Sequence, residues 1–309
     1  MKLLVTGACG QLGSDLIVEL AGRGLQTIAT GRAACPALSA AVPYVPLDLT
    51  KREAVLQTID AVRPDAVMHC AAWTAVDAAE KEENREQVFA VNAGGTRSLA
   101  LACRNTGCRL LYLSTDYVFD GHGGAPWQPD CEEYAPLNVY GQSKLAGELA
   151  VRDLLEHFFI VRISWAFGKN GGNFVKTMLQ LGKNRDRVRV VSDQIGTPTY
   201  TPDLAKLLAD MIQTERYGTY HVTNEGGYIS RYNFTKELYR QAGLQTEVLP
   251  VRTAEYGPRG AKRPLNSRLD PSKLTACGFE RLPSWQDALD RYLRGTGELE
   301  NGQNQGDDL

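Results

Sequence analysis

The chain has 309 residues, of which 43% are hydrophobic and 23% charged, and its formal net charge is −2. This composition is typical of a globular protein, and the length suits one large α/β unit or two domains. The near-neutral charge excludes the broad basic surface that nucleic-acid binding needs. No apolar run is long enough to span a bilayer, so neither nucleic acid nor membrane is expected as a partner.

The N-terminus and the cysteines indicate a cellular compartment. "MKLLVTGACG" reaches a glycine within a few residues and lacks the long apolar core of a signal peptide. The seven cysteines are scattered and form no C-x-x-C pair. We therefore expect reduced thiols in a cytoplasmic protein, and neither a disulfide framework nor a zinc site.

Strand-like and helix-like segments alternate through the first half of the chain. Apolar, β-prone runs occupy residues 2–6, 26–30, 44–48, 66–72, 109–115 and 159–165, and helical patterns occupy 13–23, 50–61, 84–105 and 138–157. Pro46 suggests an irregular or edge position for the third run. Such alternation predicts a parallel sheet with helices on both faces, which binds ligands beyond the carboxyl ends of its strands.

The pattern is looser after about residue 165. Strands are predicted at 188–193 and 219–223, and helices at 201–214, 230–242 and 284–294, with Thr201 and Ser230 as candidate N-caps. The last segment, "GTGELENGQNQGDDL", has almost no apolar content. We expect this tail, residues 295–309, to be disordered.

A glycine-rich loop, "TGACGQLG", joins the first predicted strand to the first helix. Gly7 permits a tight turn, Gly10 lets the backbone approach a pyrophosphate, and Gly13 lets helix and strand pack closely. The amides at the start of the helix then face the anion. Glycines at this spacing occur by chance, but their place between a strand and a helix predicts a dinucleotide site rather than a flexible turn.

Residues after the next strands indicate which dinucleotide binds. Where NAD sites carry an acid for the ribose 2′-hydroxyl, this chain has Gly31 and Arg32, which leave room for a 2′-phosphate and can pair with it. NADPH is therefore favoured, although a merely solvated Arg32 would leave the chain indifferent between cofactors. Asp48 could accept from the adenine amino group or cap a helix. The small Ala71 and Ala72 would let the cofactor lie against backbone.

Five residues are candidates for the chemistry. Ser114, Thr115 and Asp116 end the fifth strand, where a hydroxyl can bond a substrate oxygen, although such a triplet is more often a turn. Tyr140 and Lys144 in "YGQSK" share one face of a helix. A tyrosine has an ordinary pKa near ~10, and a cation one turn away is expected to lower it. Alone this pair is weak evidence, but its order after the loop and the strand end predicts a catalytic site.

These features resemble the extended short-chain dehydrogenase/reductases, which use a Ser/Thr–Tyr–Lys triad. Within them the chain is most similar to the dTDP-4-dehydrorhamnose reductase family. The matching stretches cover nearly the whole chain to about residue 294, and they include "GACGQLG", "CAAWTAVDAAE", "VN", "STDYVFDG", "PLNVYGQSKLAGE", "RISWAFG", "NFVKTML", "DQIGTPT" and "RPLNSRLD".

The resemblance implies a Rossmann-type doubly wound sheet in residues 1–164, to which later segments return, and a smaller sugar-nucleotide domain in residues 165–294. It implies that NADPH reduces the 4-keto group of dTDP-4-dehydro-L-rhamnose, with Tyr140 as proton donor, Lys144 on the ribose and Thr115 on the sugar. Further contacts carried over are Gly10, Gln11, Leu12, Asp48 and Leu49 for the cofactor, and Asp116, Trp165, Asn173, Arg263 and Asn266 for the substrate.

Two departures from the family pattern bear on ligands. Some members carry an acid where this chain has Gly31, which strengthens the NADPH preference, with NADH accepted more weakly. Some members dimerise through Mg²⁺ held by acidic side chains. The acidic run at residues 80–86 is better explained as a solvated helix face, so a Mg²⁺-linked homodimer stays open.

Two alternatives also stay open. A related sugar-nucleotide epimerase or 4,6-dehydratase has a similar pattern, but a dehydratase would carry Asp-Glu after the strand-five threonine, where this chain has Asp116 and Tyr117. A regulatory subunit of methionine adenosyltransferase has a similar fold and would act through a partner. The complete set of Thr115, Tyr140 and Lys144 argues for an enzyme.

Overall fold

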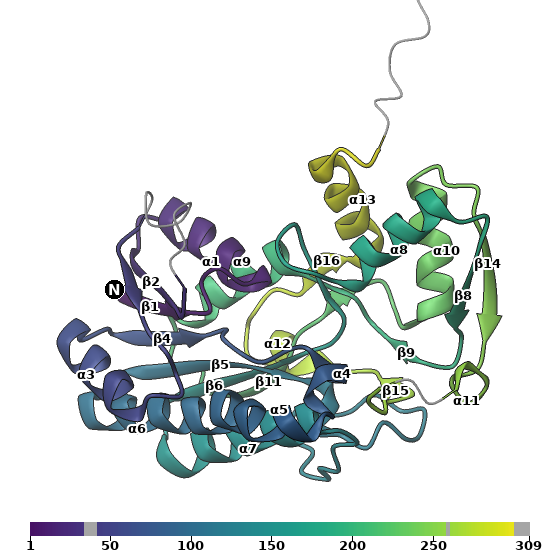
Figure 1. Ribbon diagram of the computed structural model, residues 1–309. Helices are drawn as coiled ribbons and strands as arrows, with labels where there is room; N and C mark the ends of the chain where they lie inside the picture. The colour runs from purple at the N-terminus through teal and green to yellow at the C-terminus, as the bar shows by residue number, and fades with distance from the viewer. Residues whose placement is uncertain (34–41, 258–259, 300–309) are drawn as a thin grey trace, which may run out of the picture.

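The computed structural model describes residues 1–33, 42–257 and 260–299, and its centre is one parallel sheet of seven strands (Figure 1). The order across the sheet is β11-β6-β5-β4-β1-β2-β3, and the parallel pairing confirms the prediction from alternating strands and helices. Its strands are β1 (Lys2–Thr6), β2 (Gln26–Gly31), β3 (Tyr44–Pro46), β4 (Ala66–His69), β5 (Arg109–Thr115), β6 (Phe158–Ile163) and β11 (Gly218–His221). The strand that contains Pro46 lies at the edge, which confirms the interpretation of that proline.

Helices cover both faces of the sheet (Figure 1). α1 (Gln11–Gly22) and α9 (Thr201–Met211) pack on one face, where Leu16, Leu20 and Leu204 are fully buried. The other face carries α3 (Arg52–Val62), α6 (Thr96–Thr106) and α7 (Val139–Leu154). α5 (Glu82–Phe89) leads into α6 through a π-helical segment, Ala90–Gly95. Burial on both faces explains why the strands are nearly continuous apolar runs.

A second, smaller unit has its own hydrophobic cluster, built on α8 (Phe174–Asn184), α10 (Arg231–Gln241) and α13 (Trp285–Thr296). Its paired strands β8 (Arg187–Val191) and β14 (Glu247–Val251) lie beside α10 (Figure 1). Although β11 and α9 come late in the chain, they belong to the large sheet and its cover. The short elements are α4 (Val76–Ala79), a 3-10 turn at Asp116–Val118, β7 (Ala166–Phe167), β9 (Ile195–Gly196), β10 (Thr199–Tyr200), β12 (Asn224–Glu225), β13 (Ile229–Ser230), α11 (Thr253–Tyr256), β15 (Asn266–Ser267), α12 (Ser272–Ala276) and β16 (Leu282–Ser284).

Helix ends test the predicted caps. Ser230 caps α10, because its hydroxyl accepts from the Asn233 amide at 3.0 Å. Thr201 does not cap α9: the N-cap is Tyr200, and the Thr201 hydroxyl donates to Asp15 on α1 at 2.6 Å. α13 runs to Thr296, into the segment expected to be disordered. Leu299 also packs on the second unit's cluster, whereas residues 300–309 of the predicted tail lie outside the described residues.

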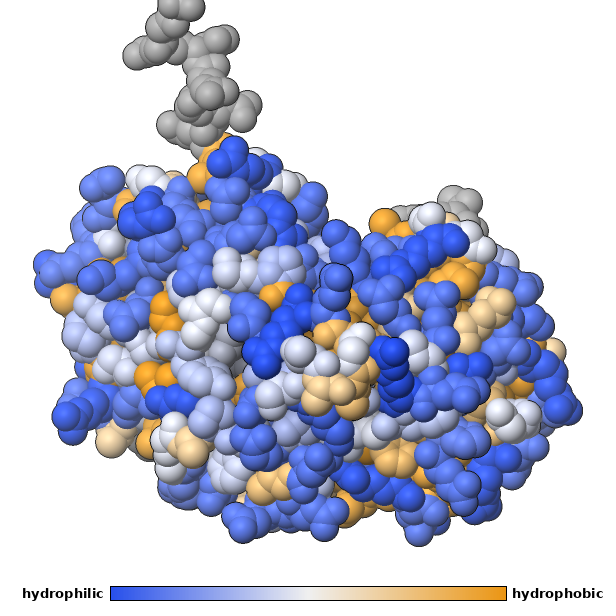
Figure 2. Space-filling model, turned by 180° about the vertical axis from the view of Figure 1, so that it is seen from behind, coloured by the Kyte–Doolittle hydropathy of each residue, from blue (hydrophilic) through white to orange (hydrophobic). Residues whose placement is uncertain are grey.

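The surface facing the viewer in Figure 2 is mainly hydrophilic, with scattered small hydrophobic groups. Among the described helices, none has both the length and the hydropathy to cross a membrane.

A buried ion pair ties α7 to the sheet. Arg162 on β6 donates to both carboxylate oxygens of Glu148 on α7, at 2.9 and 2.7 Å, and neither side chain is accessible to solvent. Arg162 also donates to the Pro129 carbonyl and the Tyr134 hydroxyl. Burying two charges is costly, so such a pair stabilises only while both partners are present.

We predict that Glu148→Gln lowers the free energy of unfolding by about 3–5 kcal/mol, because it leaves the Arg162 guanidinium buried without a counter-charge. The double variant Glu148→Leu/Arg162→Met should lose much less. Asp60→Asn, which breaks an exposed pair with Arg63, should cost under about 1 kcal/mol. Denaturant unfolding measures all three, and a Glu148→Gln effect no larger than that of Asp60→Asn would contradict the account.

Candidate active site

A cavity of about 890 Å³ lies beyond the carboxyl ends of β1, β2, β4 and β5 and reaches α8 and α10 of the second unit. This is the place that a parallel sheet predicts for a ligand. Most of the predicted site residues line it, namely Gly7, Gly10, Gln11, Leu12, Arg32, Asp48, Leu49, Ala71, Ala72, Thr115, Asp116, Tyr140, Lys144, Trp165 and Asn173. Gly13, Arg263 and Asn266 do not line it.

The glycine loop has the shape of an anion cradle. Gly7 has a φ of +67°, and a Cβ there would lie 2.6 Å from the Ala71 amide. A Cβ on Gly13 would lie 2.1 Å from the Gly7 carbonyl, so Gly13 serves helix packing rather than the ligand. Gly10 caps α1 without a side chain, and no acidic residue occupies the first turn. The amides at the start of α1 therefore face the cavity and fit a pyrophosphate.

Arg32 and Asp48, which were predicted to meet the adenosine part of the cofactor, both line the cavity. Arg32 is exposed and lines the cavity, and it is close enough to Asp48 to lower the pKa of that carboxyl. Burial alone would raise the Asp48 pKa, but hydrogen bonds from the Thr50 amide and hydroxyl, at 3.0 and 2.8 Å, outweigh it. Asp48 thus uses one oxygen as a local cap, and its role at adenine stays a prediction.

Helix α7 lies unusually close to the strand ends because two of its positions are glycine. A Cβ on Gly141 would lie 2.3 Å from the Tyr117 carbonyl, and one on Gly147 would lie 2.4 Å from the Tyr112 hydroxyl. The helix begins where Asn138 accepts from the Gly141 amide at 2.8 Å. Glu80 accepts from the Val139 amide at 2.7 Å, so one member of the acidic run holds this helix instead of only facing solvent.

Asn92 is a positioning residue. The sequence indicates no role for it and marks it only as part of the matching stretch "VN". It is buried in the π-helical segment, and its amide group binds the Trp73 backbone through both oxygen and nitrogen. The same nitrogen donates to the Ser143 hydroxyl on α7 at 2.9 Å. Asn92 thereby links the loop after β4 to the helix that carries Tyr140 and Lys144. Such π-bulges are frequent at functional sites.

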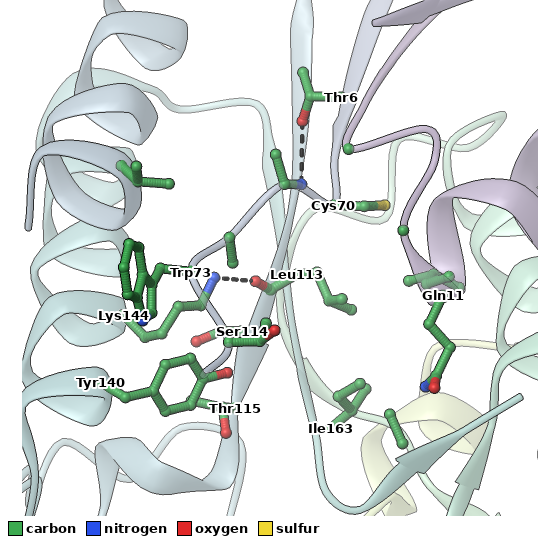
Figure 3. A pocket seen from close by; sticks show the side chains of 18 of the residues that line it. Thr6, Gln11, Cys70, Trp73, Leu113, Ser114, Thr115, Tyr140, Lys144 and Ile163 are labelled. Atoms are coloured by element: carbon green, nitrogen blue, oxygen red, sulfur yellow. Dashed lines mark hydrogen bonds between the residues drawn. The ribbon is translucent and has the colours of Figure 1, made fainter. Parts of the chain in front are cut away.

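Tyr140 and Lys144 project from one face of α7 toward the end of β5, as predicted (Figure 3). The Lys144 ammonium donates to the Leu113 carbonyl at 2.7 Å. Burial lowers the pKa of Lys144 to about 7, partly opposed by Glu148 one turn further along α7.

The expected lowering of the Tyr140 pKa by Lys144 is wrong for the protein without ligands. Burial raises the pKa of Tyr140 well above its ordinary value, the Thr115 hydroxyl opposes this by hydrogen bonding, and the Asp116 charge adds to it. Desolvation of the phenolate outweighs any attraction to a cation here. Tyr140 therefore keeps its proton at neutral pH.

Thr115 and Asp116 form the floor of the site. The Thr115 hydroxyl donates to Asp116 Oδ1 at 3.1 Å and accepts from the Tyr117 amide at 3.3 Å. Burial raises the pKa of Asp116 to about 6, and the nearby hydroxyls of Ser267 and Thr115 oppose this shift. Within the described part of the chain, Oδ2 nevertheless makes no hydrogen bond of good geometry. A buried acceptor left unpaired is available to a ligand hydroxyl.

The residues predicted to contact the substrate do not all line the cavity. Trp165 lines it as predicted, but Arg263 instead binds Asp77 at 2.7 Å, and Asn266 donates to the His122 and Ala125 carbonyls. These two residues hold loops together. Asn173 lines the cavity, although its amide is already bound to Gln11 and the Gly168 carbonyl.

Sequence reasoning missed a cation and several aromatic residues in this region. Arg231, the first residue of α10, lines the cavity and lies over the Trp165 ring at 3.8 Å. It was missed because only the fold brings the start of α10 to the cavity and over Trp165. The other lining residues without a predicted role include Leu47, Thr74, Tyr117 and Phe174. Trp73, which the sequence marks as a residue that either lines a pocket or packs, does line it.

Comparison with known proteins places the chain. A family described as RmlD substrate binding domain matches residues 1–297. A dTDP-4-dehydrorhamnose reductase of Streptomyces griseus is 42% identical over 93% of this chain and 91% of its own length. The chain belongs to the dTDP-4-dehydrorhamnose reductase family.

Two further relatives have names that mention a cofactor or a sugar nucleotide. A crystal structure of the Bacillus anthracis reductase in complex with NADP is 40% identical, with a TM-score of 0.84 over 96% of this chain and 99% of that one. A Streptomyces niveus protein named dTDP-4-keto-6-deoxy-D-glucose reductase is 36% identical over 93% of this chain and 95% of its own length. Residues 1–33, 42–257 and 260–299 of this chain contain no cluster of three or more acidic, histidine or cysteine side chains that could hold a metal ion.

Arg32 offers a direct test of cofactor choice. We predict that Arg32→Ala weakens NADPH binding roughly tenfold, because a charge-assisted contact to the 2′-phosphate is lost, and leaves NADH binding unchanged. Fluorescence titration measures both dissociation constants. Arg52→Ala, at the exposed start of α3, is the matched control, and equal losses for both cofactors would contradict the assignment.

Proposed function

We propose that this chain reduces the 4-keto group of dTDP-4-dehydro-L-rhamnose with NADPH, giving dTDP-L-rhamnose for cell-surface polysaccharide synthesis in the cytoplasm. The observation that carries the proposal is the arrangement of Tyr140, Lys144 and Thr115 around one end of a cavity whose other end is a glycine-loop cradle. The names of the relatives and the NADP-bound structure support it.

Each residue has a role that follows from its surroundings. NADPH supplies the hydride when bound. Tyr140, kept protonated by burial, donates its proton to the carbonyl oxygen as negative charge develops there. Thr115 donates to the same oxygen or holds the phenol beside it. Lys144 provides the cation that stabilises the phenolate left behind and can bond the ribose hydroxyls.

Residues of both units enclose the substrate. Trp165 and Phe174 cover the cavity from the second unit, and the unpaired oxygen of Asp116 accepts from a sugar hydroxyl. Exclusion of water strengthens every electrostatic interaction inside the cavity. Tyr117 stands where a dehydratase would need its second acid, which favours a reductase over that alternative.

The proposed reaction consumes one NADPH for each substrate molecule. We expect the purified protein to oxidise NADPH with dTDP-4-dehydro-L-rhamnose, and NADH more slowly, as followed by loss of reduced-nicotinamide absorbance. Tyr140→Phe should lower kcat by roughly 10²–10⁴ because the proton donor is gone, with NADPH still bound. Tyr228→Phe, an exposed tyrosine away from the cavity, is the control. Product formation without net NADPH loss would instead indicate an epimerase or dehydratase.

Lys144 predicts a pH dependence. Its pKa of about 7 means that the ammonium is charged below that pH and neutral above it, and only the charged form stabilises a phenolate. We therefore expect kcat/KM of the free enzyme to fall as pH rises through about 7.

The matched variant is Lys144→Arg, because a guanidinium does not deprotonate in proteins. It should be slower at every pH but should lack the fall above neutrality. A wild-type kcat/KM that stays flat to pH 9 would contradict the role assigned to the Lys144 charge.

A further inference from the structure

Arg231 is held by aromatic stacking at the substrate side of the cavity. Its guanidinium carbon lies 3.8 Å from the ring centre of Trp165 and 4.6 Å from that of Phe174. Stacking covers the faces of a guanidinium and leaves its in-plane N–H donors available. The side chain lines the cavity, so these donors have access to a ligand there.

No hydrogen bond or ion pair joins this guanidinium to another group in the described ranges. By contrast, Arg162 is paired with Glu148 and Arg263 with Asp77. Asp116 and Tyr117 influence Arg231 electrostatically without pairing with it. Burial lowers the pKa of Arg231 to about 10, which leaves it cationic at neutral pH. Arg231 is partly buried, and a cation withdrawn from water without an acceptor is unfavourable in the free protein. Such costs concentrate at functional sites.

The Trp165 ring on which Arg231 stacks is held in a fixed orientation. Trp165 has a φ of +49°, in the left-handed region that bulky residues rarely adopt. Its indole packs against Gly196, where a Cβ would lie 2.9 Å from Trp165 Cε2. The fold therefore fixes the indole, and the indole fixes the direction in which Arg231 presents its donors.

The order of groups along the cavity indicates what Arg231 meets. Thr115 and Tyr140 mark the carbonyl, and Asp116 follows Thr115 with an oxygen free for a sugar hydroxyl. Arg231 comes next, close enough to Asp116 to lower its pKa. The glycine loop and Arg32 lie on the cofactor side, so a second phosphate-bearing ligand needs its own cation.

We propose that Arg231 binds the diphosphate of the sugar nucleotide through its in-plane donors, an inference that rests on the proposed function. Two neighbouring phosphates offer the paired oxygens that a stacked guanidinium fits best. Arg231, which belongs to the second unit, would thus make the site specific for nucleoside diphosphate sugars over free sugars.

The test measures binding of dTDP and of thymidine by calorimetry, with NADP⁺ saturating so that the glycine loop is occupied. Arg231→Gln should weaken dTDP binding roughly 10- to 100-fold, the range for charge-assisted hydrogen bonds, and leave thymidine unchanged. Arg231→Lys should be intermediate, since it keeps the charge without the planar fork. Arg240→Gln, exposed on the same helix and paired with Glu237, should bind dTDP like wild type.

Two results would overturn the inference. One is unchanged dTDP affinity in Arg231→Gln, and the other is an equal loss for dTDP and thymidine, which would mean that Arg231 only packs. NADP⁺ affinity in each variant checks the fold, and Arg231→Lys serves if Arg231→Gln misfolds. The proposed function fails separately, if wild type binds dTDP but oxidises no NADPH with the 4-keto sugar nucleotide.

Discussion

The hydrogen bond from the Lys144 ammonium to the Leu113 carbonyl is the contact on which the site depends. It joins the middle of α7 to the end of β5 and so places Tyr140, one turn earlier, beside Thr115, two residues later. Gly141 and Gly147 let α7 approach β5 and the turn after it this closely. The ion pair between Glu148 on α7 and Arg162 on β6 holds the helix in that position. A helix displaced by one side-chain radius would separate the phenol from the threonine.

The same burial that positions these groups also sets their charge states. Without ligands the site holds a neutral phenol, a lysine poised near neutrality and a partly protonated aspartate. Each of these departs from its ordinary value chiefly because water is excluded. On the proposed function, the sugar nucleotide would supply acceptors for Tyr140 and Arg231 through its carbonyl and its diphosphate, and the anionic cofactor would supply a counter-charge for Lys144. The polar groups of the site are therefore arranged to pair with ligands and not with one another.

The sheet, its edge strand, the glycine loop and the order of the candidate catalytic residues could be predicted, because each depends on local pattern. Strand periodicity and strand-to-helix junctions can be recognised from short stretches of sequence, such as those around Gly7 and Pro46. Arg231 could not be found in this way, since only the packing of α10 against Trp165 makes it a cavity residue. Arg263 and Asn266 show the converse: their motifs are polar and predict substrate contact, but in this structure they lie outside the cavity and join loops, so their role at the substrate stays a prediction. The raised pKa of Tyr140 could not be predicted from sequence either, because a sequence shows a neighbouring cation but not the burial that desolvates the phenol.

The most direct measurement is a crystal structure of the complex with NADP⁺ and dTDP-L-rhamnose. The account predicts that the sugar C4 hydroxyl lies within hydrogen-bonding distance of Tyr140 Oη and faces C4 of the nicotinamide, with Thr115 beside it. A sugar bound with its C4 hydroxyl directed away from Tyr140, or a nicotinamide ring remote from that carbon, would contradict the account.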